Sequence, residues 1–555
     1  MLTNIKYKPL IALVLLCTIL TASCKKQQGI VDDPYAGGKK IAPFAFISKN
    51  TNPDIVVAGT VLNLKVRGLE SLKGDFKLYV NEVEAELKNY TDTTIQFSIP
   101  LTASTGSVWI TSKGESFFGP IIKVGGKVSV DANFKIINGA AALPGEGAAA
   151  VFDIEKLPSG RFWLGGSFSN FEQKGTAALP IGGIVQIDAN GAYLTTDINF
   201  GKAALGAAKT IYSISRISEG NQAGKFIIAG SFNGYNINRA NRLTLNNIAR
   251  LNANGRLDTI VTKEIINPKP QEISKNADTV PAFNAGVDGP VRKAFIFGEQ
   301  IYIVGNFQNF VRVYYPNSTY DEKVYDVTRM MQLVRVNEDG SMDSTFHYNK
   351  AIRQSAAGAN GVILDAAMQT DGKLILAGSF TSFNGVTVNR IVRLNLDGSV
   401  DPSFKSGVGA DGDIHSIRYN ASTNKFTLSG NFSRFNGKPS SGVVLLNADG
   451  SNVDSFIGEQ ISGGMATFAA QLNNGKIIVA GSFNRYGNYL RQGFMILDTN
   501  GKLAVGYNNT GGFQGRIYDM VETVVGNDSQ VILVGEINRF NSMLPKNVLR
   551  LIISN

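Results

Sequence analysis

Apolar runs of strand length recur through most of the chain, and each ends in a Gly-x-Phe motif. The first run is FWLGGSF at 162–168, and the last is VILVGEI at 531–537, where Ile replaces Phe. Five further copies lie between them, at 226–232, 301–307, 374–380, 426–432 and 477–483. Short apolar runs that are bounded by Gly are typical of buried β-strands. The pattern therefore predicts seven copies of one β-unit.

A second half-unit follows these runs, and its centre is a turn sequence. Its clearest form is RLNLDGSVDPSF at 393–404, with related stretches at 335–346, 446–456, 250–258 and 497–503. Asp-Gly between apolar runs is a strong hairpin signal, because the turn needs a positive φ that Gly accepts. Each repeat is therefore predicted to hold two hairpins, or four strands.

The spacing of the repeats predicts their arrangement. Successive motif glycines, from Gly166 to Gly535, are 64, 75, 73, 52, 51 and 54 residues apart, and the shorter steps fit one propeller blade. The last apolar run, at 548–553, has no turn after it, whereas GKVSVDANF at 126–134 resembles the missing half-unit. We therefore expect these two segments to pair and to close a seven-bladed β-propeller over residues 125–555.

The repeat resembles the delta-sixty-repeat β-propeller family over about 430 residues. The whole layout also resembles a family of exported bacterial lipoproteins, through DPYAGGK at 33–39, VNEVEAE at 80–86 and FFGP at 117–120. That resemblance implies a setting beside starch-utilisation-type glycan uptake systems.

Residues 43–124 hold shorter runs, which Gly, Asn and Pro separate. Alternating stretches at 61–66, 76–80, 94–99 and 107–110 suggest a small β-sandwich. Their order resembles an IPT/TIG immunoglobulin-like domain, which implies a spacer or docking role. We expect Trp109 to pack in the core of this sandwich.

The first 24 residues have the pattern of a lipoprotein signal. Lys6 and Lys8 precede a short apolar stretch, and small residues precede Cys24. Residues 1–23 are therefore predicted to be a signal peptide, Cys24 the lipid attachment site, and residues 24–42 a flexible tether. Thr21 stands where this pattern usually has Leu, so ordinary cleavage that leaves a free thiol is the alternative. Lys25 and Lys26 favour the outer membrane, although which face of it is left open.

The amino-acid composition argues against several classes of functional site. Two His and two Cys in 555 residues argue against a His-rich catalytic metal site and against a disulfide framework. The net charge of +10 is scattered and forms no basic block, which argues against nucleic-acid binding. No cofactor is expected. His347 and His415 share no motif, and we interpret both as surface or packing residues.

Alternating oxygen-bearing residues in the turns raise the question of calcium. Asn395, Asp397, Ser399 and Asp401 alternate like the ligands of a calcium loop. However, Phe404 stands where a calcium loop would supply Glu, and Asp and Asn stabilise turns without metal. We favour the turn-stabilising role and predict no metal site.

Two insertions interrupt the repeats. Residues 311–329 contain Tyr314, Tyr315, Tyr320 and Tyr325, whose rings could stack on sugars. The alternative, which we favour, is an extended hairpin with cross-strand Tyr pairs. Residues 262–290 contain four prolines and are predicted to form a long irregular loop.

Together these features predict a lipid-anchored, all-β, non-enzymatic binding or scaffold protein of the bacterial envelope. Its partners would be the membrane, through the lipid, and a glycan or an envelope protein. No catalytic motif of a known class is evident. The alternative is a glycan hydrolase or lyase that uses carboxylates in the propeller funnel.

Overall fold

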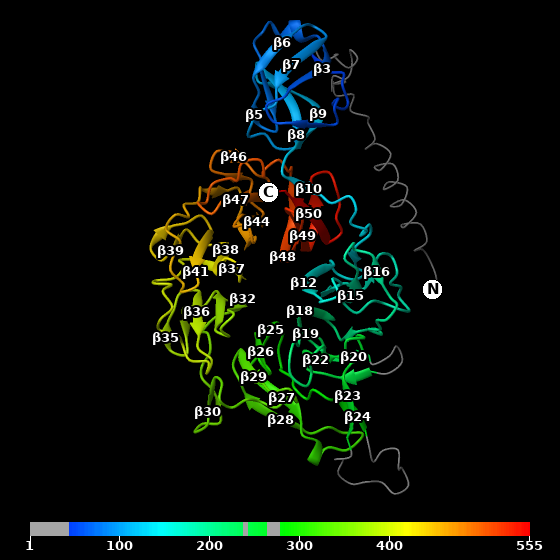
Figure 1. Cartoon of the computed structure of the whole chain (residues 1–555), viewed down its shortest axis with the longest axis vertical. Coiled ribbons are helices and arrows are strands. Elements are labelled where there is room, and N and C mark those ends of the chain that lie inside the picture. The colour runs from blue at the N-terminus through cyan, green and yellow to red at the C-terminus, as the bar shows by residue number, and fades with distance from the viewer. Residues whose placement is uncertain (1–43, 237–241, 263–277, 555) are drawn as a thin grey trace, which may run out of the picture.

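The protein is all-β in the residues that the computed structural model describes, which are 44–236, 242–262 and 278–554. Figure 1 shows a small N-terminal unit above a ring of sheets that surround a common centre. Apart from two short 3-10 helices, the described elements are strands. Within the described part of the chain, no helix has the length and apolar character needed to cross a membrane.

The N-terminal unit consists of two sheets that enclose one core. In strand order, one sheet is β1 (Ala45–Phe46), β3 (Val61–Arg67), β7 (Thr94–Ser98) and β6 (Leu87–Tyr90). The other is β2 (Ile55–Val57), β9 (Glu115–Gly125), β8 (Gly106–Ser112), β4 (Lys77–Val80) and β5 (Val83–Glu84). Alternate residues of β3, namely Leu62, Leu64 and Val66, point into the core, as period-two patterning requires.

The ring is built from sheets that repeat along the chain, and each begins with an inner strand. The inner strands are β12 (Ala150–Lys156), β18 (Thr210–Arg216), β25 (Val291–Phe297), β32 (Ile363–Met368), β37 (Asp413–Asn420), β43 (Ala466–Gln471) and β48 (Phe513–Val525). Each pairs antiparallel with a strand that carries the Gly motif: β13 (Phe162–Ser167), β19 (Phe226–Ser231), β26 (Gln300–Gly305), β33 (Leu374–Gly378), β38 (Lys425–Asn431), β44 (Ile477–Gly481) and β49 (Asp528–Phe540).

A third strand follows in each of these sheets. These strands are β15 (Ile184–Ile187), β22 (Ile248–Leu251), β29 (Leu333–Val336), β36 (Ile391–Leu394), β41 (Val443–Asn447), β47 (Phe494–Leu497) and β50 (Val548–Ile553). The predicted fourth strand is often only a single bridge, such as Leu394 with Val400. The Asp-Gly turn lies between these two residues, and Gly398 has the positive φ of 82° that the sequence predicts. The chain turns away after one bridge. The prediction of four strands per repeat is therefore wrong for these sheets, which have three strands and one bridge.

The two ends of the ring meet in one sheet. β10 (Val128–Val130) pairs antiparallel with β50, so that Val128 faces Ile553 and Val130 faces Leu551. This pairing confirms the match that the sequence predicts between these segments. The buried Arg550 guanidinium also binds the Asp131 carboxylate at 2.8 Å, and Ile532 packs in one core cluster with Val151 of β12.

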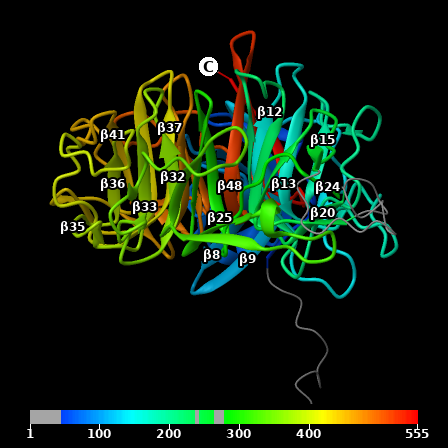
Figure 2. The same cartoon turned by 90° about the horizontal axis from the view of Figure 1, so that it is seen from below.

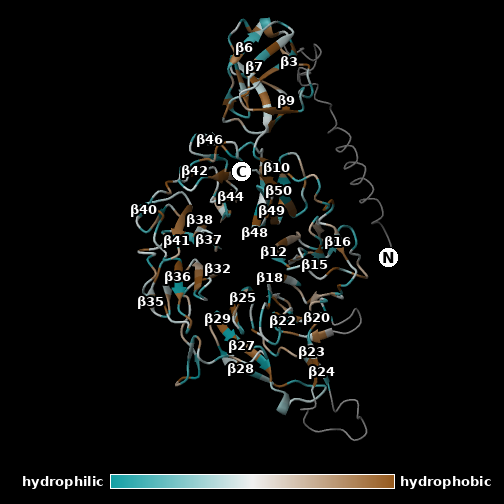
Figure 3. Cartoon of the chain, in the orientation of Figure 1, coloured by the Kyte–Doolittle hydropathy of each residue, from teal (hydrophilic) through white to brown (hydrophobic). Residues whose placement is uncertain are grey.

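Apolar side chains fill the space between neighbouring sheets. One core cluster joins Ile375 and Ile391 of one sheet with Ile417 and Leu428 of the next. Figure 3 shows hydrophobic segments, in brown, along the strands of the ring. Figure 2 shows the same sheets standing side by side, with the long β48–β49 hairpin projecting beyond its neighbours.

Asn509 joins the N-terminal unit to the ring. Its side-chain amide donates hydrogen bonds to the carbonyls of Val124 (3.2 Å) and Val128 (3.0 Å). The backbone carbonyl of Asn509 accepts a hydrogen bond from the backbone N–H of Thr105 at 3.0 Å. One buried side chain therefore connects the last strand of the first unit with the first strand of the ring.

Candidate functional site

Each inner strand of the ring carries a β-bulge near its start. At the bulge, one residue has no partner on the neighbouring strand, and its side chain is turned toward the centre of the ring. These bulged residues are Phe152, Tyr212, Arg292, Leu364, His415, Thr467 and Tyr518.

The repeated glycine of the sequence motif lies opposite the bulge. A Cβ atom on Gly378 would lie 2.1 Å from the carbonyl oxygen of Val362, which the bulge brings close. The same clash, at 2.0–2.3 Å, would occur at the equivalent glycines Gly166, Gly230, Gly305, Gly430, Gly481 and Gly535. The bulge therefore explains why the glycine recurs. In each sheet, the same bulge turns one side chain toward the centre of the ring.

The bulged residues line a central cavity of about 270 Å³. The other side chains that line it come from the same inner strands and are mostly polar or charged. They include Lys293, Asp365, Ser416, Arg418, Phe468 and Arg516. The cavity therefore lies where the inner strands of distant sheets converge (Figure 1).

The residue after the bulge often ties its sheet to the next one. Asp153 accepts the backbone N–H of Ile214 at 2.5 Å, and Asp365 accepts that of Ile417 at 3.0 Å. Two more such bonds join Asp519 to the N–H of Ile154 at 3.3 Å and Ser213 to that of Ala294 at 3.2 Å. Because the bulges leave backbone N–H groups without strand partners, these side chains satisfy them.

Buried charges of both signs meet behind the cavity wall. Lys293 lies 3.5 Å from the Asp153 carboxylate, and Arg418 lies 3.4 Å from that of Asp519. Burial raises the pKa of Asp153 to about 7, against the attraction of Lys293. Burial also acts to raise the pKa of Asp519, but Arg418 and Lys293 outweigh it and keep that pKa below its usual range.

Two further titratable groups lie close to this cluster. Burial raises the pKa of Glu155 to about 8, and the neighbouring Asp153 and Asp519 add to the effect. Glu155 is therefore mostly protonated at neutral pH. Burial lowers the pKa of His415 despite the nearby Asp413, so this imidazole is neutral and can donate or accept a hydrogen bond.

Aromatic rings form one side of the cavity. The Phe152 ring lies 4.8 Å from that of Tyr212 and 4.7 Å from that of Tyr518, centroid to centroid. The Arg292 guanidinium stands 5.2 Å over the Tyr212 ring. The site thus combines ring faces, hydroxyl groups and cations.

The four tyrosines that the sequence singles out lie elsewhere. They belong to the hairpin of β27 (Asn309–Val313) and β28 (Tyr325–Arg329) and to the 3-10 helix Tyr315–Asn317 between them, at the outer edge of the ring (Figure 1). The favoured hairpin is present, but Tyr325 pairs with Val313 rather than with another Tyr. Tyr314, Tyr320 and Tyr325 are exposed, whereas burial raises the pKa of Tyr315 to about 12.

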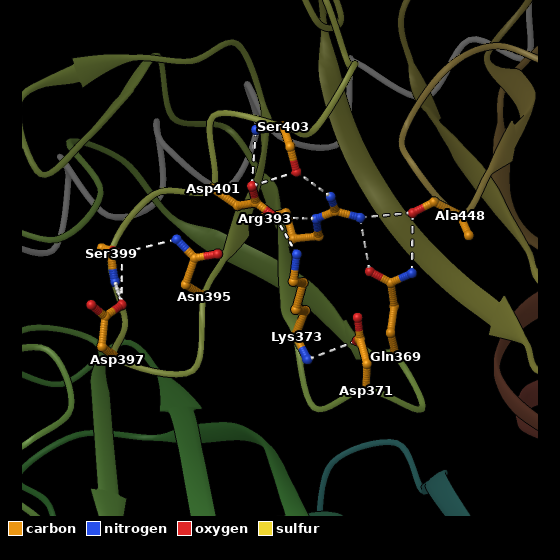
Figure 4. Close-up of polar contacts among 10 residues, drawn as sticks. All are labelled: Gln369, Asp371, Lys373, Arg393, Asn395, Asp397, Ser399, Asp401, Ser403 and Ala448. Carbon is orange, nitrogen blue, oxygen red and sulfur yellow. Dashed lines mark hydrogen bonds and ion pairs between the residues drawn. The ribbon is translucent and has the colours of Figure 1, made fainter.

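The oxygen-bearing residues of the Asp-Gly turns are bound to their own neighbours. Asp397 accepts the backbone N–H of Ser399 at 2.9 Å, while Asp401 binds Arg393 at 2.9 Å and Lys373 at 2.8 Å (Figure 4). Arg393 then donates to the carbonyl of Ala448 in the next sheet at 2.8 Å. These contacts are those of turn stabilisation and of attachment between sheets.

Other sequence predictions have different outcomes. Trp109 does not pack in the core, because the alternation of β8 puts Val108 and Ile110 inside. Trp109 instead stacks on Tyr79 on the outer face, at 4.4 Å. Cys24 lies outside the described residues, as do 263–277 of the predicted loop. That loop is not irregular throughout, since β24 (Asp278–Pro281) pairs with β23 (Thr259–Thr262).

Sequence reasoning missed the central cavity, although the repeats contain a signal for it. The bulged position holds an aromatic, a cation, an aliphatic residue or a hydroxyl in different repeats, after an apolar residue and usually before a polar one. His415, interpreted above as a surface or packing residue, is one of them. His347 is buried and lies near the Phe383 ring, at 5.8 Å, so the packing interpretation holds there.

Two family models match parts of the chain. A β-propeller domain of unknown function (DUF5122) matches residues 224–259, 369–404, 422–451 and 472–503. A second domain of unknown function (DUF5008) matches residues 19–120. Together with the ring of sheets, the first match defines the chain as an all-β protein with a propeller-like fold. No curated protein matches the chain.

Several solved structures resemble the chain at low sequence identity. The WD40 β-propeller domain of Doa1 is 12% identical, with a TM-score of 0.39 over 75% of this chain and 96% of that one. A Bacteroides thetaiotaomicron protein of unknown function is 11% identical, with a TM-score of 0.28 over 90% and 95%. The extracellular domain of a B. thetaiotaomicron protein described as a one-component system is also 11% identical, with a TM-score of 0.36 over 75% and 40%.

Proposed function

We propose that this protein is a lipid-anchored, non-enzymatic binding protein of the bacterial envelope, which holds a glycan in its central cavity. The observation that carries the proposal is the ring of bulges, each of which turns one side chain into that cavity. Aromatic faces beside hydrogen-bonding groups suit a sugar, which has both apolar faces and hydroxyls.

In this proposal, the repeated sheets are the blades of a seven-bladed propeller. The N-terminal unit is an IPT/TIG-like sandwich that spaces the ring from a lipid on Cys24, in the outer membrane. The signal pattern of the first 24 residues supports the anchor. The resemblance to exported lipoproteins supports a place beside a glycan uptake system.

The burial of the carboxylates favours binding over hydrolysis. Glycosidases need two carboxyl groups about 5–9.5 Å apart on either side of the sugar bond. Asp153 and Asp519 instead interact directly with each other, and each also accepts a backbone N–H from a neighbouring sheet. Groups that hold the ring together in this way are poorly placed to transfer protons to a substrate.

A glycan array probed with the purified protein tests the proposal. We expect binding that Tyr518→Ala weakens and that Tyr314→Ala and Tyr315→Ala leave unchanged, because Tyr518 lines the cavity and the two hairpin residues do not. If the hairpin variants lose binding while Tyr518→Ala retains it, the site lies at the outer edge instead. Release of a smaller sugar from any bound glycan would support the hydrolase or lyase alternative.

A further inference from the structure

The cavity holds more cations than its buried carboxylates neutralise. Lys293 and Arg418 are paired with Asp153 and Asp519, as described above. Within the described part of the chain, neither Arg292 nor Arg516, which also line the cavity, has an ion pair with a carboxylate. The partly buried Arg292 guanidinium and the exposed Arg516 guanidinium are therefore both available to a ligand.

Hydrogen-bond donors are also left over. The Nε–H of Arg292 is buried and has no acceptor in the described structure, and the same holds for the Nε–H of Arg418. Buried polar groups in folded proteins nearly always have a partner, so such donors point to an acceptor that the protein itself does not supply.

The acidic side chains near the cavity do not fill this need. Asp365 is the carboxylate in the cavity wall, and its oxygens accept the backbone N–H groups of Ile417 and Ala366. Glu536 faces Arg516 across the β48–β49 pair but forms no ion pair with it. The described carboxylates therefore leave the Arg292 donor free for an acceptor from outside the chain.

The side chains around these donors limit the kind of molecule that can bear the anionic group. Arg292 stands over the Tyr212 ring, and that ring contacts Phe152, which in turn contacts Tyr518. A small ring with an apolar face can lie against such aromatic side chains. The volume of about 270 Å³ is just below the roughly 300–1,000 Å³ of drug-sized ligand pockets, so the occupant is small.

We infer that the cavity is specific for an acidic sugar and that Arg292 and Arg516 bind its carboxylate. This inference rests on the proposed function, which it narrows from glycans in general to uronic acids. Arginine suits the role because its planar fork matches a carboxylate and stays charged. A neutral sugar would leave the buried Arg292 donor without an anionic acceptor, and this penalty supplies the discrimination.

Calorimetric titration of the purified protein with a galacturonic acid oligomer tests the inference. The neutral galactose oligomer of the same length is the matched ligand. We expect the acidic oligomer to bind at least about tenfold more tightly, as a charged hydrogen bond allows. Arg292→Gln and Arg516→Gln should each remove most of that difference. Arg434→Gln is the matched control, because the Arg434 side chain is exposed, does not line the cavity and donates to the Gly437 carbonyl at 3.2 Å.

The outcomes separate this inference from the proposed function. Equal affinity for the two oligomers, with binding lost in Tyr518→Ala, would overturn the acidic specificity and leave glycan binding intact. Binding of neither oligomer, with tight binding of inorganic sulfate alone, would overturn both. Arg292→Lys is a control for misfolding, because lysine keeps the positive charge but lacks the planar guanidinium that binds a carboxylate through two hydrogen bonds. We expect it to melt like the wild type and to bind the acidic oligomer with intermediate affinity.

Discussion

Two aspartates of the same turn motif differ in what they contribute. Asp397 is exposed, and its hydrogen bond from Ser399 lowers its pKa at the surface. Asp401 is buried and bound by two cations, which lower its pKa although burial opposes them. The residue type and the repeat are shared, so only the surroundings separate the two roles.

Substitution of these aspartates should separate their contributions. Asp401→Asn leaves Arg393 buried without its counter-ion, which should destabilise the ring by about 3 kcal/mol or more. Asp397→Asn loses one exposed contact and should cost under about 1 kcal/mol. Urea unfolding, followed by tryptophan fluorescence, measures both values. Equal effects would contradict the assigned roles.

The same contacts predict that the ring does not depend on calcium. The oxygens of Asp397 and Asp401 are already bound within the protein, so a cation would have to displace those partners. We expect the melting temperature to be the same with calcium and with EDTA, measured by differential scanning calorimetry. A rise in melting temperature with calcium would show that the turns bind it.

Glu155 should make the stability of the ring depend on pH. Its pKa is about 8 in the folded protein and near 4.5 without burial, so the folded state holds an extra proton between these values. Stability therefore falls as pH rises through this window. Glu155→Gln removes this loss, and we expect its melting temperature relative to wild type to rise by a few degrees from pH 5 to pH 9. A constant difference across this range would contradict the raised pKa.

At the scale of elements, the bulge of the inner strand and the glycine of its partner form one unit. The carbonyl that the bulge displaces occupies the space of a Cβ atom at Gly378 and its equivalents. The next apolar position of the motif, Phe380, is fully buried against the adjacent strands. Gly-x-Phe therefore encodes a bulge and its packing, besides the end of a strand.

Replacement of a motif glycine should disrupt its sheet. Gly378→Ala places a Cβ atom 2.1 Å from backbone, which cannot move without shifting the bulge. We expect a loss of about 2–4 kcal/mol, at the upper end of overpacking effects. Gly147→Ala is the control, because no atom lies within 4 Å of its Cβ position. Thermal melting compares the two, and equal melting temperatures would refute the close approach.

Some elements could be predicted from sequence, and the failures have physical causes. Strands with the Gly motif such as β33 and β44 are buried on both sides and apolar throughout, so they are easily recognised. The bulge is hidden because its residue faces the cavity and differs from repeat to repeat. The prediction for Trp109 is wrong because strand alternation with the buried Val108 and Ile110 decides its side, whatever its size.

At the scale of the whole molecule, the pairing of β10 with β50 joins the two ends of the ring. This pairing could be predicted, because the two half-repeats that it joins are recognisable at opposite ends of the sequence. The cavity could not, since its wall comes from residues as distant as Phe152 and Tyr518, which nothing in their local sequence connects. The tyrosine insertion stands out from the repeats in sequence, but it lies at the outer edge of the ring.

Removal of the last strand should prevent the ring from closing. A chain that ends at residue 547 lacks β50, so Val128–Val130 loses its partner and Asp131 loses Arg550. We expect the cooperative melting transition of the ring to disappear in circular dichroism. A chain that ends at Ile553 keeps the pairing and should melt like the intact protein. Normal melting of the shorter chain would show that closure does not need this strand.

The joining of Val128–Val130 to Leu551–Ile553 has a consequence for biosynthesis. As the ribosome makes the chain, β50 emerges only after β10 and the strands of every intervening sheet. Contacts between residues this distant in sequence form late, because closing the chain between them costs conformational entropy. The ring therefore stays open until β50 has been made, and during that time β10 presents a strand edge without its partner.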